Sequence, residues 1–263
     1  MNNVNKEILG KVPEVTLAFW IIKIAATTLG ETGGDAVTMS MHLGYLVGTA
    51  IFATIFVVGV TAQIAVKGFH PFLFWAVIVA TTTAGTTLAD LFDRSLGIGY
   101  VGGSSMLSVL LAATLGLWYW SLGSVSIDKI DSRKAEIFYW VTIMFSQTLG
   151  TALGDWIADD QAGLGLGYEG GALVFAAGLA VVAGAYFWTN LSHTLLFWAA
   201  FILTRPFGAT VGDLLDKPVA NGGLALSRYT ASAALAVFII ACIIFLPQRA
   251  EKRETTQTPR DDP

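Results

Sequence analysis

Eight apolar runs, each close to the length that crosses a lipid bilayer, dominate this sequence. About 20 apolar residues in a helix span the hydrocarbon core. Because backbone polar groups in lipid must be satisfied within the protein, such runs fold as helices. Charged residues make up only 13% of the chain, which is about half their usual share in soluble domains. The runs predict transmembrane spans at roughly 14–34, 45–66, 71–91, 104–122, 136–157, 170–189, 194–214 and 229–246.

The segments outside these spans predict the domain organisation and the orientation. The links are short, so we expect one transmembrane domain at 14–246, between a cytoplasmic segment at 1–13 and a charged, disordered cytoplasmic tail at 247–263. Lys and Arg accumulate in cytoplasmic loops. Most of them here fall on the side of both termini, which are therefore predicted to be cytoplasmic. The opposite links hold Arg94, Lys217 and Arg228.

A fourfold internal repeat organises the spans. In each odd-numbered span a Trp is followed ten residues later by Gly and fifteen residues later by Asp. Each repeat holds two spans, so all four share one orientation. We predict an all-α membrane bundle of eight transmembrane helices, built from four parallel two-helix repeats at about 14–66, 71–122, 136–189 and 194–246. The matching sets are Trp20, Gly30 and Asp35; Trp75, Gly85 and Asp90; Trp140, Gly150 and Asp155; and Trp198, Gly208 and Asp213.

The sequence of repeat 2 is most similar to that of repeat 4, and the sequence of repeat 1 to that of repeat 3. This pairing predicts a pseudo-twofold bundle. With its four Trp and Asp spacings, the chain resembles a bacterial family of four-repeat integral membrane proteins of unknown function. That resemblance covers about residues 14–246. It implies the architecture and a place in the bacterial cytoplasmic membrane, and it implies no activity.

A polar stripe runs along each odd-numbered span. At about 100° per residue, positions 0, 7, 11 and 15 after each Trp fall within an arc of about 80°. A charge at the membrane centre costs about 2.5–3.5 kcal/mol or more, so the stripes are expected to face one another or water. They supply the ion-binding candidates Thr27, Glu31, Asp35, Thr82, Asp90, Gln147, Asp155 and Asp213, with Thr86 and Thr151 on the same faces.

Two interpretations of the stripes stay open. In one, the four aspartates form an acidic ring at the outer mouth, and Glu31, deeper and unique to repeat 1, is functional. In the other, the aspartates are solvated loop residues, and the threonines join helices by hydrogen bonds. Lys23 and Arg205 are candidates for gating or ion pairing. A buried Arg needs a carboxylate partner, and Glu31 is the expected one.

The remaining aromatic and histidine residues suggest no cofactor. Trp20, Trp75, Trp140 and Trp198 lie near the cytoplasmic ends of their spans and are predicted to anchor them at the membrane interface. His70 and His193 lie near the same interface and His42 lies on the outer side, without metal-ligand spacing.

The pattern favours transport over catalysis. No aspartate has the Gly-x-Gly-Asp context of an intramembrane aspartyl protease, and no zinc, phosphate-loop or Ser/His/Asp pattern is present. We therefore predict neither an enzyme nor a cofactor. The lipid bilayer is the expected partner, and the absence of a basic helix predicts no nucleic acid. A non-transporting sensor, scaffold or ligand-binding protein is the alternative.

Parallel repeats around an acidic core suit a cation transporter or channel. Oxygen ligands without Cys or clustered His favour divalent ions such as Mn²⁺ or Mg²⁺, with Glu31 and Asp35 as metal candidates. The run Glu31-x-Gly33-x-Asp35 resembles the Glu-x-Gly-Asp helix motif of a manganese and calcium exporter family. It departs from that motif by one extra residue and by the missing basic residue after Asp.

Overall fold

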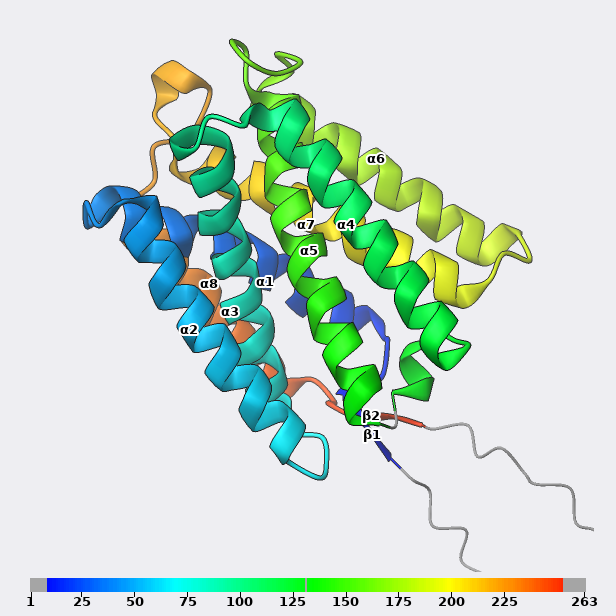
Figure 1. The fold of residues 1–263 in the computed structure, drawn as a ribbon. Coiled ribbons are helices and arrows are strands. Elements are labelled where there is room, and N and C mark those ends of the chain that lie inside the picture. Colours follow the sequence, from blue (N-terminus) through cyan, green and yellow to red (C-terminus); the bar gives the residue numbers. More distant parts are fainter. Residues whose placement is uncertain (1–8, 131, 253–263) are drawn as a thin grey trace, which may run out of the picture.

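The computed structural model describes residues 9–130 and 132–252 (Figure 1). Within them, eight long helices follow the apolar runs, so the predicted all-α bundle is confirmed. The helices are α1 (Leu17–Asp35), α2 (Gly44–Ala65), α3 (Pro71–Asp90), α4 (Gly99–Leu122), α5 (Arg133–Ala158), α6 (Gly167–Trp188), α7 (His193–Asp216) and α8 (Arg228–Phe245). Shorter elements are β1 (Leu9–Pro13), β2 (Ala250–Lys252), the helical turns η1 (Ala36–Ser40) and η2 (Leu91–Ser95), and the turns η3 (Ile127–Lys129) and η4 (Val219–Asn221).

The four odd-numbered helices form a closed ring. α1 packs against α3 and α7, and α5 packs against the same two helices. The tryptophans at the starts of these helices cluster at the end that carries β1 and β2, which we call the strand end. The aspartates at their ends meet at the opposite, carboxylate end. The odd helices are therefore parallel, as the repeat predicts.

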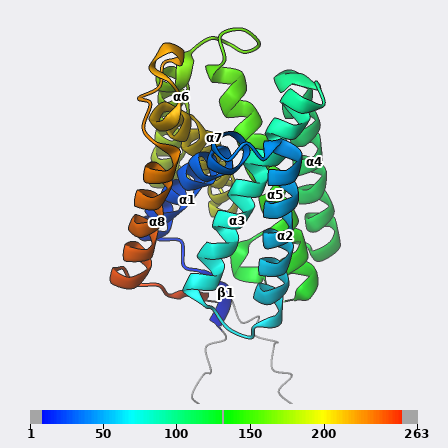
Figure 2. The same cartoon turned by 90° about the vertical axis from the view of Figure 1, so that its left-hand side faces the viewer.

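Each even-numbered helix packs mainly on the odd helix of the next repeat. α2 lies on α3, α4 on α5, and α6 on α7. α8 completes the circle by packing on α1, beside it in Figure 2. The sequence unit is thus a two-helix repeat, whereas the packing unit joins neighbouring repeats. Closure of the ring rests on the first and last repeats meeting.

Six helices are long and apolar enough to cross a membrane: α2, α3 with η2, α4, α6, α7 and α8. α1 and α5 do not reach that composition among the described residues. Both lie in the inner ring, where neighbouring helices cover their polar side chains. Inside the bundle a helix therefore tolerates charges that a lipid-facing helix would not.

The repeated glycines allow the inner helices to cross closely. A Cβ added to Gly30 would lie 3.0 Å from the backbone carbon of Thr82 in the next repeat, and one on Gly208 would lie 3.0 Å from that of Thr27. Gly85 faces the backbone of Gln147 in the same way, and Gly150 faces the side-chain stem of Arg205. The Gly of each repeat therefore packs on the seventh residue after the Trp of the next, around the whole ring.

We expect Gly85→Ala to destabilise the protein by about 1–3 kcal/mol, the usual cost of overpacking. Its new Cβ would lie 2.9 Å from the backbone carbon of Gln147 and 3.0 Å from the backbone nitrogen of Thr148. Gly116→Ala on α4 is the matched control, because a Cβ there meets nothing within 4 Å. Thermal unfolding in detergent compares the two. Equal transitions would refute the close crossing.

The strand end is closed by segments from both ends of the chain. β1 and β2 pair antiparallel. Lys11 on β1 forms an ion pair with Glu136 at 2.7 Å, and Gln63 on α2 donates a hydrogen bond to the Lys11 carbonyl at 3.1 Å. Residues 250–252, within the predicted disordered tail, form β2, because β1 supplies a pairing partner. Residues 253–263 of that tail lie outside the described residues.

Candidate functional site

The polar stripes of the four inner helices meet inside the ring. Every polar side chain of the stripes is buried. The sequence pattern of one helix does not show which neighbouring helices cover its stripe. We call the set the polar column. It comprises Thr27, Thr82, Gln147 and Arg205 at its middle, then Glu31, Thr86 and Thr151, and finally Asp35, Asp90, Asp155 and Asp213 at the carboxylate end.

Arg205 is the centre of the column's middle. Its Nη2 donates to Glu31 Oε2 at 2.9 Å and to Thr86 Oγ1 at 2.6 Å, and it also contacts the hydroxyl of Thr151. These partners come from α1, α3 and α5, so one guanidinium on α7 ties together all four inner helices. The glycine at position 150 makes room for the Arg205 stem. The expected Arg205 and Glu31 pair is thus present in the structure.

The aspartates at the carboxylate end are paired rather than free. Arg94 Nε lies 2.8 Å from Asp90 and its Nη2 lies 3.1 Å from Asp155, which bridges α3 and α5. Lys217 Nζ lies 3.0 Å from Asp213 and contacts Asp35, which bridges α7 and α1. In this conformation the predicted acidic ring is therefore a layer of ion pairs.

A third cation reinforces this layer. Arg228, the first residue of α8, lies 3.3 Å from Asp216 and 3.7 Å from Asp35.

Burial disfavours the charged form of Lys217, which follows α7. The nearby carboxylates, chiefly Asp213 and Asp35, outweigh burial and hold the Lys217 pKa well above its ordinary value. The Lys217 side chain therefore stays protonated and positively charged at neutral pH.

Three carboxylates of the column converge closely enough to hold a metal ion. Glu31, Asp35 and Asp213 each place an oxygen within 4.8 Å of the other two, and all three side chains are buried. Oxygen atoms of this kind are ligands that Mg²⁺, Mn²⁺ and Ca²⁺ prefer. Asp35 Oδ1 is buried and makes no hydrogen bond to a described residue. The trio adds Asp213 to the two metal candidates taken from the sequence.

The four repeats match a known protein-family model. That model is described as a repeat of unknown function, DUF347, and it matches residues 18–69, 73–124, 138–192 and 196–249. The chain belongs to the DUF347 repeat family. No curated protein and no solved structure matches it. The predicted four-repeat family is therefore confirmed, and it supplies no activity.

Lys23, in the first DUF347 repeat, lies apart from the carboxylates. Its Nζ is 3.5 Å from Thr204 Oγ1 and 4.1 Å from the centre of the Phe201 ring. At the same position the other repeats have Ile78, Ile143 and Phe201, which are all fully buried. Lys23 therefore occupies an otherwise apolar layer nearer the strand end, and the structure shows no ion pair for it among the described residues.

Gln147 is the second unusual polar residue of the DUF347 repeats. It is fully buried, and neither its Oε1 nor its Nε2 makes a hydrogen bond to a described residue. Its neighbours across the ring are better satisfied: Thr82 donates to the Ala26 carbonyl at 3.1 Å, and Thr27 donates to the Thr204 carbonyl at 3.2 Å. Those two threonines join adjacent helices.

The characteristic tryptophans of the DUF347 repeats form an aromatic layer inside the strand end. Trp75, Trp140 and Trp198 are 1–4% exposed. Neighbouring helices cover these three rings, which the sequence alone would place at the lipid boundary as interfacial anchors. Only Trp20 is partly exposed. The layer closes the polar column at this end.

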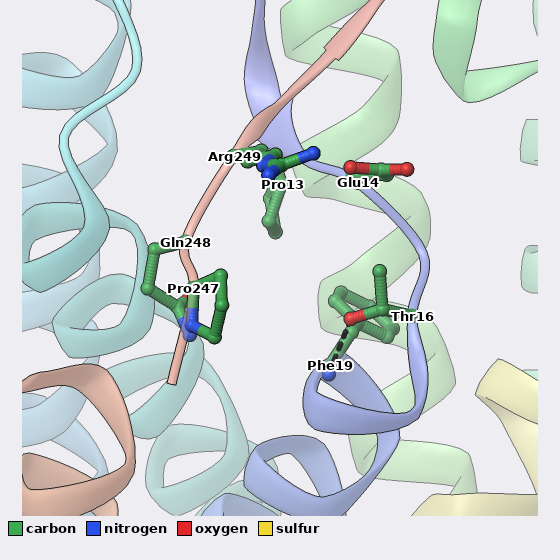
Figure 3. Close-up of a pocket in the computed structure, with 7 residues that line it drawn as sticks. All are labelled: Pro13, Glu14, Thr16, Phe19, Pro247, Gln248 and Arg249. Atoms are coloured by element: carbon green, nitrogen blue, oxygen red, sulfur yellow. Dashed lines mark hydrogen bonds between the residues drawn. The ribbon is translucent and has the colours of Figure 1, made fainter. Parts of the chain in front are cut away.

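Two cavities lie near the strand end. One, of 220 Å³, lies between the start of α1 and the segment before β2, where Thr16 accepts a hydrogen bond from the Phe19 backbone (Figure 3). The other is an 810 Å³ groove along α1, α6 and α7, which His193 lines. Neither cavity is lined by a carboxylate of the polar column. His42, His70 and His193 are exposed.

The cations that complete the column were not among the predicted site residues. From the sequence, Arg94, Lys217 and Arg228 were expected only as charges in the outer links. A signal was available, because the DUF347 repeats 2 and 4 share Asp-Leu-x-Asp followed by Arg or Lys. These runs are Asp90 to Arg94 and Asp213 to Lys217.

Proposed function

We propose that this protein carries a cation across a membrane, as a transporter or channel, with Glu31, Asp35 and Asp213 as the binding site. The supporting observation is the convergence of these three buried carboxylates within 4.8 Å, inside a ring of parallel helices. The Oδ1 of Asp35 makes no hydrogen bond to a described residue, so it is available as a ligand atom there. The donor set suits a divalent ion such as Mn²⁺ or Mg²⁺.

Movement of an ion requires a conformational change. The column residues are buried, and the aromatic layer closes the strand end. Arg94, Lys217 and Arg228 join neighbouring helices at the other end. The carboxylate end is therefore the proposed entrance, and it opens when these ion pairs rearrange. Because most Lys and Arg lie toward the strand end, we propose that both termini are cytoplasmic and that the membrane is the bacterial cytoplasmic one.

A non-transporting scaffold or sensor is the second candidate. The observation that favours it is the burial and pairing of Arg205 and Glu31, whose side chains are 0% and 3% exposed. A buried ion pair of this kind specifies how helices assemble in some proteins. Against a purely structural role, Gln147 and Asp35 Oδ1 are buried without a partner among the described residues, which a fully satisfied core would avoid.

Flux measurements in proteoliposomes separate these functions. Wild-type protein should take up or release Mn²⁺ above the level of protein-free vesicles, and Glu31→Gln should lower the flux by at least roughly tenfold, since one site ligand loses its charge. Asp160→Asn is the matched control, because Asp160 is exposed in the loop after α5. Background flux of all tested cations with folded wild-type protein would overturn the transport proposal and favour the scaffold.

A further inference from the structure

The pseudo-twofold relation between the repeats places two cations at equivalent positions, where each bridges two aspartates. Arg94 and Lys217 each come nineteen residues after the Trp of their repeat. Each lies four residues after an Asp of its own repeat and also reaches the Asp that lies fifteen residues after the Trp of the next inner helix. The two halves of the ring are thus closed by the same kind of bridge, built once with Arg and once with Lys.

The halves differ in what surrounds the bridge. Next to Lys217, Glu31 adds a third carboxylate to Asp35 and Asp213. The position equivalent to Glu31 in the other half is Thr151, eleven residues after its Trp. Only the Lys217 half therefore has a converging trio among the described residues, and only there does the bridge between helices lie in a candidate metal site.

Arg and Lys suit different roles in such bridges. The Arg94 guanidinium uses two nitrogens, Nε and Nη2, for two separate carboxylates, a rigid arrangement. The Lys217 ammonium is a single point charge on a flexible stem, and one Nζ serves both of its carboxylates. An incoming cation replaces a point charge more easily than a guanidinium fork.

The backbone at Lys217 is held while its side chain spans the site. The Lys217 carbonyl accepts a hydrogen bond from the Ala225 N–H at 2.9 Å, and the Leu224 N–H donates to the Leu214 carbonyl at 2.7 Å. A Cβ on Gly223 would collide with the Lys217 carbonyl, so the turn is tight. Release of the ammonium thus requires rotation about side-chain bonds and no refolding of the loop.

We infer that the Lys217 ammonium is a tethered occupant of the cation site, which a substrate cation displaces, whereas Arg94 permanently clamps the other half. This inference rests on the proposed function, because it makes the Lys217 ammonium a competitor of the substrate cation at the proposed cation site. Lys217 leaves as a charged group. Binding therefore exchanges one cation for another within the carboxylate trio, and displacement loosens the bridge between α7 and α1.

Manganese binding to the purified full-length protein in detergent tests the inference, with free Mn²⁺ followed by electron paramagnetic resonance. Lys217→Met removes the competitor and should bind Mn²⁺ roughly tenfold more tightly than wild type, and Lys217→Arg should bind it roughly tenfold more weakly. Arg94→Lys, the matched change in the other half, should leave the affinity within about twofold. Because Lys217→Arg keeps the positive charge, its Mn²⁺ affinity still tests the inference if Lys217→Met does not fold.

The outcomes separate the inference from the proposed function. Unchanged affinity in both Lys217 variants, with binding lost in Glu31→Gln, would overturn the inference and keep the cation site. An equal effect of Arg94→Lys and Lys217→Arg would also overturn it, since the halves would then be equivalent. If neither wild type nor Lys217→Met binds Mn²⁺, both the inference and the proposed metal site fail.

Discussion

Replacement of Arg205 by methionine should destabilise the bundle by about 3–5 kcal/mol, the usual cost of removing one partner of a buried ion pair. Arg205 is fully buried, and its Nη2 donates to Glu31 at 2.9 Å. Methionine fills much of the same space but leaves the Glu31 carboxylate without its cation, and Thr86 loses a 2.6 Å hydrogen bond. Denaturant unfolding of the purified protein in detergent, followed by tryptophan fluorescence, measures the loss.

A double variant identifies the cause. Arg205→Met combined with Glu31→Gln removes both charges, and it should regain most of the lost stability because no uncompensated charge remains. Arg133→Met is the control for removing an arginine, since Arg133 is exposed at the start of α5; it should change stability by no more than about 0.5 kcal/mol. A double variant as unstable as Arg205→Met would assign the loss to packing around Gly150 instead of to charge.

The spacing of residues within the repeats predicted much of this molecule. Trp, Gly and Asp recur at fixed intervals, so they identify both the helix limits and the helix face that is buried. The close contact of Gly30 with Thr82 follows from the same reasoning, because small residues mark sites where membrane helices approach. These features either lie within one helix or recur in every repeat, so they can be predicted from one amino-acid sequence.

Features that depend on which helices are neighbours were harder to predict. A two-helix repeat suggests that its members pack together, yet α2 lies on α3 and α8 lies on α1. Lys23 shares a helix with Glu31 but sits eight residues earlier, in the layer of Ile78 and Ile143. Its depth relative to the other repeats decides its surroundings, and this depth becomes evident only when equivalent positions are compared.

The bridging cations illustrate a different limit. Arg94 and Lys217 lie at or beyond the ends of the apolar runs, where exposed charges are ordinary, so composition alone gives them no significance. Their shared motif in repeats 2 and 4 is visible in the sequence. Its meaning, a bridge to the Asp of the following repeat, depends on the ring that brings Asp155 and Asp35 within reach.

Trp75→Ala should cost about 3–5 kcal/mol, the range for truncating a buried Trp. Trp75 is 1% exposed, and its ring centre lies 5.3 Å from that of Phe74 and 5.4 Å from that of Phe19. Its Nε1 donates to Gln248 Oε1 at 3.1 Å, which ties α3 to the segment before β2. Thermal unfolding in detergent, followed by circular dichroism, measures the change.

Trp120→Ala on α4 is the matched control, because Trp120 is 84% exposed and its loss opens no cavity; we expect a change within about 0.5 kcal/mol. Gln248→Leu isolates the hydrogen bond and should cost about 0.5–1.5 kcal/mol. If Trp75 were an interfacial anchor, as the sequence suggested, Trp75→Ala and Trp120→Ala would have similar small effects. A large difference between them places the repeated tryptophan in the core, where it holds the closed end of the column together.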